Sequence, residues 1–248
     1  MNNLKVIILA AGKGKRMGSD LPKVLHRLGE KTLLEHVVET AHPLDYANQP
    51  IVVYGYQGEL IQQKMQHLPV KWVEQAEQLG TGHALKQTVS HVADATHVLV
   101  LYGDIPLTSA KTLHHFIHQT PPDALGIITA HLPNPMGYGG RIIRDSENNV
   151  KCVIEEKDAT ELQLTIKEVN SGFYIIPVNY LNRWLSDIEN HNSQQEYYLT
   201  DIIQLAARDN VTIHTTHPEC YEEILGINDL AQLARLETFY EHRVAQQI

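Results

Sequence analysis

A short glycine-rich and basic stretch holds the residues with the clearest capacity for chemistry. Residues 12–18 read GKGKRMG, with Arg16 inside the stretch and Lys23 just after it. Five lysines and arginines fall between residues 13 and 27, where an even spread of the chain's 20 would place about one. Glycine lets a backbone approach a phosphate, and amides and cationic side chains can neutralise its oxygens. The stretch therefore predicts an anion site, with a solvated charged loop as the alternative.

The spacing of these glycines does not fit two common phosphate-binding motifs. A dinucleotide-binding fingerprint would have its third glycine at Met17, but the sequence has it one residue later, at Gly18. A Walker A loop needs Gly-Lys-Ser/Thr, and neither Gly14 nor Gly18 begins that triplet. A nicotinamide dehydrogenase is therefore disfavoured.

Asp104 is the best-placed acidic residue. It follows the apolar run 97–102, so it should lie at the carboxyl end of a strand. Mg²⁺ takes oxygen ligands, usually one or two protein carboxylates, while it bridges phosphates. Asp104 is therefore a candidate metal ligand, with a turn or a helix N-cap before Pro106 as the alternative.

The histidines and cysteines carry weaker signals. His114, His115 and His118 fall on one predicted helix, and an i, i+4 histidine pair can bind zinc. No glutamate or cysteine accompanies them, so a solvated helix face is the favoured interpretation. The chain has two cysteines, too few for a disulfide framework or a four-thiolate zinc site.

Alternating apolar runs and helical patterns predict the elements that position these residues. In the first half, the alternation favours a parallel sheet with right-handed crossovers. The second half is richer in strands, and residues 145–149 predict a hairpin turn. We predict strands over 6–11, 50–55, 70–73, 97–102, 125–130, 140–143, 150–154, 169–176 and 211–214, and helices over 32–41, 58–65, 81–92, 178–189, 200–207 and 229–246, besides the helix that carries His114, His115 and His118.

The chain contains no low-complexity linker and no internal repeat, so we expect a single domain over residues 1–248. It would consist of a first half over 1–123, a second half over 124–227 and a C-terminal helix over 228–248. The fold class expected is α/β, with a mixed, mostly parallel central sheet flanked by helices.

Composition excludes several classes of protein. With 43% hydrophobic and 20% charged residues, the 248-residue chain is not typical of a disordered protein. A formal charge of −9 disfavours nucleic-acid binding. No apolar run approaches the roughly 20 residues of a membrane span, and the first one is too short for a signal peptide. We therefore expect a cytoplasmic protein with no membrane or nucleic-acid partner.

Taken together, the motifs resemble those of a known enzyme family. LAAGKGKRM at residues 9–17, followed by LPK at 21–23, resembles the signature of sugar-1-phosphate nucleotidyltransferases. QAEQLGTGHA at 75–84 and LYGDIPL at 101–107 are similar to the uracil-binding and metal-binding segments of the N-acetylglucosamine-1-phosphate uridyltransferases. Further matches follow in the family's order at 137–139, 155–159, 168–172, 196–201 and 226–228, so that the resemblance covers nearly the whole chain.

This resemblance implies a Rossmann-like nucleotidyltransferase fold and a specific reaction. A Mg²⁺-dependent uridylyltransferase would join UTP and N-acetylglucosamine 1-phosphate to give UDP-N-acetylglucosamine and pyrophosphate, which serves cell-wall peptidoglycan synthesis. The sugar phosphate would attack the α-phosphate directly. The alternatives are a nucleotidyltransferase for another sugar 1-phosphate and a catalytically silent UDP-sugar-binding module.

The resemblance also implies residue roles. Arg16 and Lys23 would neutralise the triphosphate and pyrophosphate, and Asp104 would act with Asn228 as the Mg²⁺ ligands. As an alternative, Asn228 could cap the final helix. The remaining substrate contacts would come from Leu9, Ala10, Gly12, Gln75, Gly80, Thr81, Tyr102 and Gly103 toward the nucleotide, and from Gly139, Glu155 and Asn170 toward the amino sugar.

The chain departs from the family pattern in three ways. Gly139-Gly140-Arg141 replaces the usual single glycine before arginine, so that either glycine could contact the sugar. Lys15 stands where the family usually has a small hydroxyl residue. The left-handed β-helix of hexapeptide repeats found in bifunctional members is missing, so we expect neither acetyltransferase activity nor a β-helix-driven trimer. Whether the chain is a trimmed or a naturally single-function protein stays open.

Overall fold

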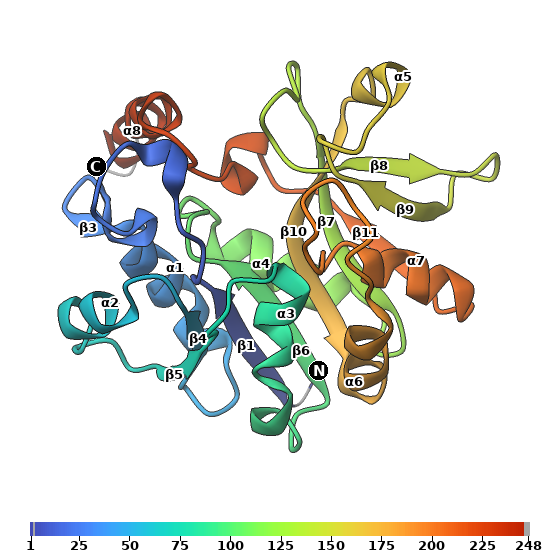
Figure 1. Ribbon diagram of the computed structural model, residues 1–248, viewed down its shortest axis with the longest axis horizontal. Coiled ribbons are helices and arrows are strands. Elements are labelled where there is room, and N and C mark those ends of the chain that lie inside the picture. Colours follow the sequence, from blue (N-terminus) through green and yellow to red (C-terminus); the bar gives the residue numbers. More distant parts are fainter. Residues whose placement is uncertain (2, 246–248) are drawn as a thin grey trace.

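A mixed sheet runs through the centre of the molecule (Figure 1), as the computed structural model shows for the residues that it describes, 1 and 3–245. Its main strands lie in the order β11-β7-β10-β6-β1-β4-β5. β1 pairs in parallel with both β4 and β6, β4 with β5, and β7 with β11, whereas β10 is antiparallel to its neighbours. The predicted fold class is thus confirmed. The strands are β1 Leu4–Leu9, β4 Ile51–Tyr54, β5 Lys71–Glu74, β6 His97–Tyr102, β7 Leu125–His131, β10 Glu168–Pro177 and β11 Ile213–Thr216.

The apolar sequence of β1 explains its central place. All six residues of this strand are buried, because helices cover both faces of the sheet. Val6 and Ile8 join one hydrophobic cluster with α1, α4 and α8, while Ile7 and Leu9 join a second cluster with α3, α6 and α7. Successive side chains of β1 point to opposite faces of the sheet, so this strand contributes to both hydrophobic cores.

Local capping signals fix several helices. The Thr32 hydroxyl accepts from the Glu35 amide and the Glu35 carboxylate accepts from the Thr32 amide, which forms a capping box at the start of α1. Ser109 caps α4 in a similar way through the Thr112 amide. The helices are α1 Leu33–Ala41, α2 Gly58–Lys64, α3 Thr81–Lys86, α4 Ala110–Gln119, α5 Glu161–Leu164, α6 Val178–Asp187, α7 Asp201–Arg208 and α8 Leu230–Ala245.

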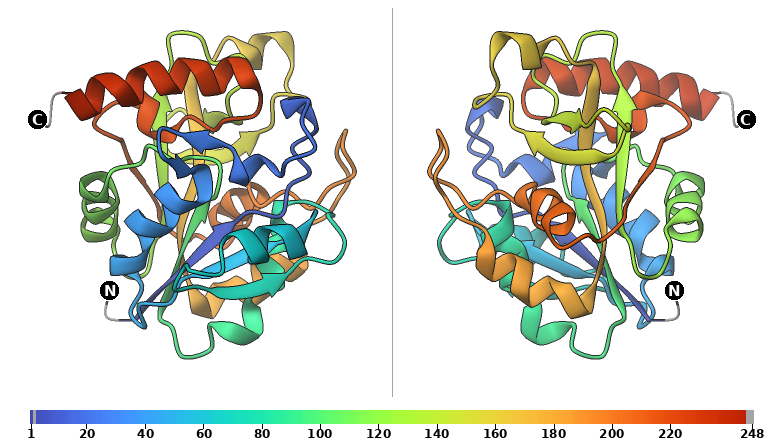
Figure 2. Two further views of the ribbon diagram at one scale, coloured as in Figure 1. Left: turned by 90° about the vertical axis from the view of Figure 1, so that its left-hand side faces the viewer. Right: turned by 90° about the vertical axis from the view of Figure 1, so that its right-hand side faces the viewer.

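A hairpin extends the second half of the sheet at the end where α8 lies (Figure 1). It consists of β8 Arg141–Arg144 and β9 Val150–Ile154, and β8 also pairs with β10. In the predicted turn over 145–149, Asp145 accepts hydrogen bonds from the Glu147 and Asn149 amides. Figure 2 shows α8 crossing this same end of the molecule, so the hairpin, α8 and the loop after β1 gather around the carboxyl ends of the parallel strands.

Several element boundaries differ from the sequence predictions. The helix expected over 81–92 ends at Lys86, where the Thr88 hydroxyl bonds the Leu85 carbonyl and a 3₁₀ turn, Val89–His91, follows. The strand expected over 211–214 is Ile213–Thr216, because the Val211 amide is still bonded to Ala206 at the end of α7. The first strand is Leu4–Leu9 rather than 6–11.

The short helix α5 and the hairpin formed by β2 Arg27–Leu28 and β3 Lys31–Thr32 were not predicted. The end predicted for the last helix, Gln246, lies outside the described residues. Within the described part of the chain, no helix combines the length and the apolar character needed to cross a bilayer.

Candidate active site

The loop after β1 lies between the ends of two neighbouring strands. The Ala10 amide donates to the Val53 carbonyl over 2.8 Å, and the Gly103 amide donates to the Leu9 carbonyl over 2.9 Å. A Cβ on Gly103 would lie 3.2 Å from the Ala10 Cβ, so little room separates the two loops. Leu9 and Ala10 are buried and Gly12 is exposed, which leaves the backbone from Gly12 onward open at this end of the sheet.

The conformation of Gly14 affects where the basic loop places its two predicted cationic residues, Arg16 and Lys23. Gly14 has φ +58°, and a Cβ there would lie 2.8 Å from the Lys23 Cβ, so a larger residue would push Lys23 away. Arg16 is exposed on the 3₁₀ turn Lys15–Met17, which Met17 anchors in the core. The fold therefore brings Lys23 inward and leaves Arg16 at the solvent boundary.

Lys23, Asp104 and Asn228 meet directly. The Lys23 ammonium pairs with Asp104 Oδ2 and donates to Asn228 Oδ1 over 3.2 Å. The side chains of Lys23 and Asp104 are each 15% exposed, so this is a half-enclosed cluster rather than a surface ion pair. The Ile227 amide bonds the Asp104 carbonyl over 3.0 Å and so joins the segment before α8 to the turn after β6.

Asp104 and Asn228 both lie in positions that could also serve a turn or a helix cap. Asp104 does lie in a turn, closed by a bond from the Ile105 amide to the Tyr102 carbonyl, and its carboxylate points to Lys23. At the start of α8, Asp229 accepts from the Gln232 amide, and Gln232 accepts from the Asn228 amide. Because Asp229 performs the cap, the Asn228 side chain is left for the cluster with Lys23.

The predicted uracil segment is held in place by residues 197–199, which come from the other half of the chain. Gln75 is 3% exposed and its amide nitrogen donates to the Gly80 carbonyl over 3.0 Å. Gly80 has φ +115°, and a Cβ there would lie 2.6 Å from the Tyr197 carbonyl oxygen. The Thr81 hydroxyl accepts from the Leu199 amide over 3.0 Å. The three predicted nucleotide contacts thus lie together.

Tyr102 connects the predicted nucleotide and sugar contacts. Its phenol lies close to Thr81, and its ring lies against Gly172, where a Cβ would be 2.7 Å from the ring. Burial raises the pKa of this phenol, and the nearby charge of Glu155 raises it further. Tyr102 therefore stays protonated and uncharged.

The predicted sugar contacts meet beside β10. The Asn170 amide donates to the Gly140 carbonyl over 2.9 Å, and its side-chain nitrogen donates to the Tyr174 hydroxyl over 2.6 Å. Asn170 is 6% exposed, yet its side-chain oxygen is buried without a hydrogen-bond partner. The Glu155 carboxylate accepts from the Thr200 hydroxyl over 3.3 Å, and burial raises its pKa.

Both glycines of the pair that departs from the family pattern are sterically required. Gly139 has φ +61°, and a Cβ there would lie 2.5 Å from the Asn170 carbonyl oxygen. A Cβ on Gly140 would lie 2.4 Å from a Val153 methyl carbon. Gly139 and Gly140 therefore let the loop press against β10 and β9 at the same time.

Sequence reasoning did not assign roles to several polar residues that the fold brings into these clusters. Tyr174 and Thr200 hold Asn170 and Glu155 by side-chain hydrogen bonds. Arg141 is fully buried next to the glycine pair. An arginine inside an otherwise apolar strand pattern was the available signal, but its partner could not be read from the sequence.

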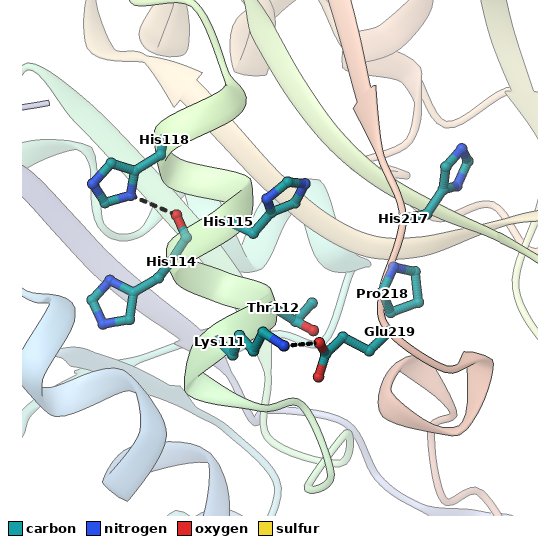
Figure 3. A pocket seen from close by; sticks show the side chains of 8 residues that line it. All are labelled: Lys111, Thr112, His114, His115, His118, His217, Pro218 and Glu219. Atoms are coloured by element: carbon teal, nitrogen blue, oxygen red, sulfur yellow. Dashed lines mark hydrogen bonds and ion pairs between the residues drawn. The ribbon is translucent and has the colours of Figure 1, made fainter.

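A histidine-lined cavity of about 680 Å³ lies elsewhere, between α4 and residues 217–219. Figure 3 shows His115 and His217 on facing sides of it, whereas His114 and His118 point to the other side of α4. The His118 ring bonds the His114 carbonyl over 2.7 Å. Across residues 1 and 3–245, no group of three or more histidine, cysteine or acidic side chains is arranged to hold a metal ion.

This chain is similar to known nucleotidyltransferases in sequence. A family described as "MobA-like NTP transferase domain" matches residues 6–209. The bifunctional protein GlmU of Coxiella burnetii (strain CbuK_Q154) is 45% identical over 245 residues, and that of Dechloromonas aromatica (strain RCB) is 46% identical. These alignments cover 99% of this chain but only 53% and 54% of the relatives, so the chain spans about half their length.

A solved structure shares the architecture. The nucleotidyl transferase from Methanothermobacter thermautotroptrophicus superposes with a TM-score of 0.70, covering 98% of this chain and 100% of that one. Because the sequence identity is only 17%, this structural similarity shows a shared fold and nothing about function.

Proposed function

The chain belongs to the family of MobA-like NTP transferase domains, and from that premise we propose that it is a sugar-1-phosphate uridylyltransferase. It would join UTP and N-acetylglucosamine 1-phosphate to give UDP-N-acetylglucosamine and pyrophosphate. The observation that carries the proposal is the meeting of Lys23, Asp104 and Asn228 beside the open glycine loop. A module that only binds nucleotide sugars has no need of such a cluster.

The proposed reaction requires the enzyme to position its two anionic substrates and to stabilise the negative charge of the leaving group. An oxygen of the sugar phosphate is already ionised near neutral pH, so no side-chain base is required to activate it. The enzyme must instead bring two anions together and stabilise the charge that develops on the departing pyrophosphate. Lys23 supplies a half-buried cation for this charge, and Arg16 supplies a mobile one from the rim of the loop.

The donor atoms of the cluster suit Mg²⁺. Asp104 Oδ2 and Asn228 Oδ1 converge on one cationic atom, the Lys23 ammonium, so both oxygens already point toward a common positive charge. A carboxylate and an amide oxygen are hard ligands of the kind that Mg²⁺ takes beside phosphate oxygens. We expect Asp104 and Asn228 to hold this ion, which when bound neutralises charge on the triphosphate.

A buried polar atom supports a sugar substrate that carries hydrogen-bond donors. The side-chain oxygen of Asn170 is buried and unpaired, which costs about 1–3 kcal/mol when nothing satisfies it. An N–H or hydroxyl of the sugar would supply the missing donor. On the nucleotide side, the amide groups of Gln75 and Gly80 lie together and would read the edge of a pyrimidine.

The proposal is tested by a substrate panel. Pyrophosphate release would be measured with UTP, ATP, CTP and GTP, each combined with N-acetylglucosamine 1-phosphate or glucose 1-phosphate, with and without Mg²⁺. We expect the highest kcat/KM for UTP with the acetylated sugar, and no release without the metal. Preference for another sugar or nucleotide would replace the substrate assignment. Tight binding of UDP-N-acetylglucosamine by a folded sample without turnover on any pair would instead identify a binding module.

A further inference from the structure

A buried ion pair fastens the Gly139–Gly140 loop. The Arg141 side chain is 0% exposed, and its Nη1 donates to the Gly139 carbonyl over 2.9 Å and to the Tyr138 carbonyl over 3.3 Å. Its Nη2 donates to Glu156 Oε2 over 3.1 Å. The same carboxylate oxygen accepts from the Gly137 amide over 2.8 Å. One guanidinium and one carboxylate thus hold three consecutive residues of the loop; we call Arg141 and Glu156 the loop clamp.

The loop clamp joins the two ends of the hairpin formed by β8 and β9, which Figure 1 shows side by side. Arg141 is the first residue of β8, and Glu156 follows β9 by two residues. The residue before Glu156 is Glu155, one of the proposed sugar contacts. The clamp therefore fixes the glycine loop relative to the segment that carries the Glu155 carboxylate.

The position of the loop sets the spacing among the proposed sugar contacts. The Gly140 carbonyl accepts from the Asn170 amide over 2.9 Å, and a Cβ on Gly140 would lie 3.5 Å from the Glu155 carboxyl carbon. A Cβ on Gly139 would lie 2.5 Å from the Asn170 carbonyl oxygen. The loop therefore contacts Asn170 on one side and lies beside Glu155 on the other, so a shift of Gly139 or Gly140 would disturb both proposed sugar contacts.

The clamp is poorly suited to stabilise the fold by itself. Transferring a charge from water into a protein interior costs several kcal/mol, which an ion pair offsets only when its geometry and hydrogen bonds are complete. The Nε of Arg141 is buried without a partner, so this guanidinium is not fully satisfied. Glu156 is 31% exposed, and water weakens its attraction for Arg141. The arrangement specifies a loop geometry more effectively than it adds free energy of folding.

We propose that Arg141 and Glu156 are positioning residues that set the affinity of the sugar subsite without touching the substrate. The proposal rests on the proposed function, because it concerns the same sugar-phosphate site. Arg141 acts through the Tyr138 and Gly139 carbonyls, and Glu156 acts through the Gly137 amide and through its bond to Arg141. Neither residue is in the cluster of Lys23.

The charge of Arg141 also acts on Glu155. Burial raises the pKa of the Glu155 carboxyl, as do the charges of Asp158 and Asp201, whereas the Thr200 hydrogen bond and the nearby Arg141 charge lower it. The clamp therefore helps to keep Glu155 ionised against burial, in addition to fixing the loop.

The neighbouring pair Arg144–Glu168 provides a matched control. Arg144 lies on the same strand as Arg141, and its Nε and Nη2 donate to the two Glu168 oxygens over 2.8 and 2.7 Å. This pair links β8 to β10, and its other side-chain hydrogen bonds go to Thr129 and Asn148 rather than to residues 137–140. Loss of either pair should affect stability, and only loss of the loop clamp should affect the sugar.

The test compares Arg141→Lys, Glu156→Gln and the control Arg144→Lys. For both clamp variants we expect the KM for N-acetylglucosamine 1-phosphate to rise about tenfold, while the KM for UTP stays within about twofold and kcat within about threefold. Calorimetric titration should show UDP-N-acetylglucosamine binding weakened by a similar factor and UDP binding unchanged. The control should keep all three kinetic constants and both binding constants.

Two results would overturn the proposal. One is a KM for the sugar phosphate that rises no further in Arg141→Lys and Glu156→Gln than in Arg144→Lys. The other is an equal rise in the KM for UTP, which would indicate a general loss of structure. Glu156→Gln keeps one amide oxygen for Arg141 and so preserves the test if Arg141→Lys fails to fold. If the unaltered enzyme released no pyrophosphate with any pair, the proposed function would fail instead, which separates the two claims.

Discussion

Replacing Gly172 with alanine would show how firmly the fold holds Tyr102. Gly172 has φ +86°, and an added Cβ would lie 2.7 Å from Cε2 of the Tyr102 ring and 3.2 Å from two further ring atoms. A left-handed conformation costs a non-glycine residue about 1–2 kcal/mol, and overpacking costs about 1–3 kcal/mol more. We therefore expect Gly172→Ala to lower the free energy of unfolding by about 2–5 kcal/mol, the sum of these costs.

Gly18 is the control that separates the two costs. Its φ is +61°, but an added Cβ would have nothing within 4 Å, so Gly18→Ala should lose only the backbone cost of about 1–2 kcal/mol. Urea unfolding of both variants measures the difference. Since Tyr102 lies close to Thr81, one of the proposed nucleotide contacts, displacement of the ring in Gly172→Ala should also raise the KM for UTP. Equal losses of stability in Gly172→Ala and Gly18→Ala would refute the argument that the Tyr102 ring is packed against Gly172.

Three further predictions follow from charged groups. Lys5→Met leaves the buried Asp45 carboxylate without its ammonium partner and should cost about 3–5 kcal/mol of unfolding free energy by urea titration; a loss below about 1 kcal/mol would contradict this. Burial first, then the charges of Asp158 and Glu189, raise the pKa of Asp201 to about 6, above its unfolded value of 3.8, so its contribution to stability is present below pH 4 and lost as pH rises through 6. Asp201→Asn should therefore gain about 1–2 kcal/mol over the unaltered protein at pH 8 and nothing at pH 4, after allowance for solvent screening, and equal melting-temperature differences at both pH values would argue against it. Lys23→Met should lose about 2–4 kcal/mol of transition-state stabilisation, read as kcat/KM for UTP, and an unchanged kcat/KM would remove Lys23 from its proposed role.

The parallel half of the fold could be predicted from the sequence because its apolar runs are buried on both faces. Residues 97–102 are a continuous apolar run that forms β6 with the predicted bounds. The helix predicted from residue 81 was too long, because its apolar pattern continues beyond Lys86 while the Thr88 hydroxyl and the turn after it end the regular bonding. Boundaries of this kind depend on local side-chain bonds and tertiary packing, which hydrophobic periodicity does not report.

For the candidate site, the sequence indicated the residue types but not how they pair. Lys23 and Asp104 are 81 positions apart, and Lys23 and Asn228 are 205 positions apart, so only the folded sheet and α8 bring them together. The proximity of the uracil segment to residues 196–199 likewise arises from bonds such as Leu199 to Thr81. The buried partnership of Arg141 with Glu156 was not predicted, because an arginine at the start of a strand is more often exposed.

The most direct test of uridylyl transfer is a ³¹P NMR time course of the protein with UTP, N-acetylglucosamine 1-phosphate and Mg²⁺. We predict that the signals of the triphosphate and the sugar monophosphate decline together while those of a nucleotide diphosphate sugar and of pyrophosphate grow in equal amounts. Unchanged spectra from a folded sample, or growth of inorganic phosphate without a diphosphate sugar, would contradict the proposed function.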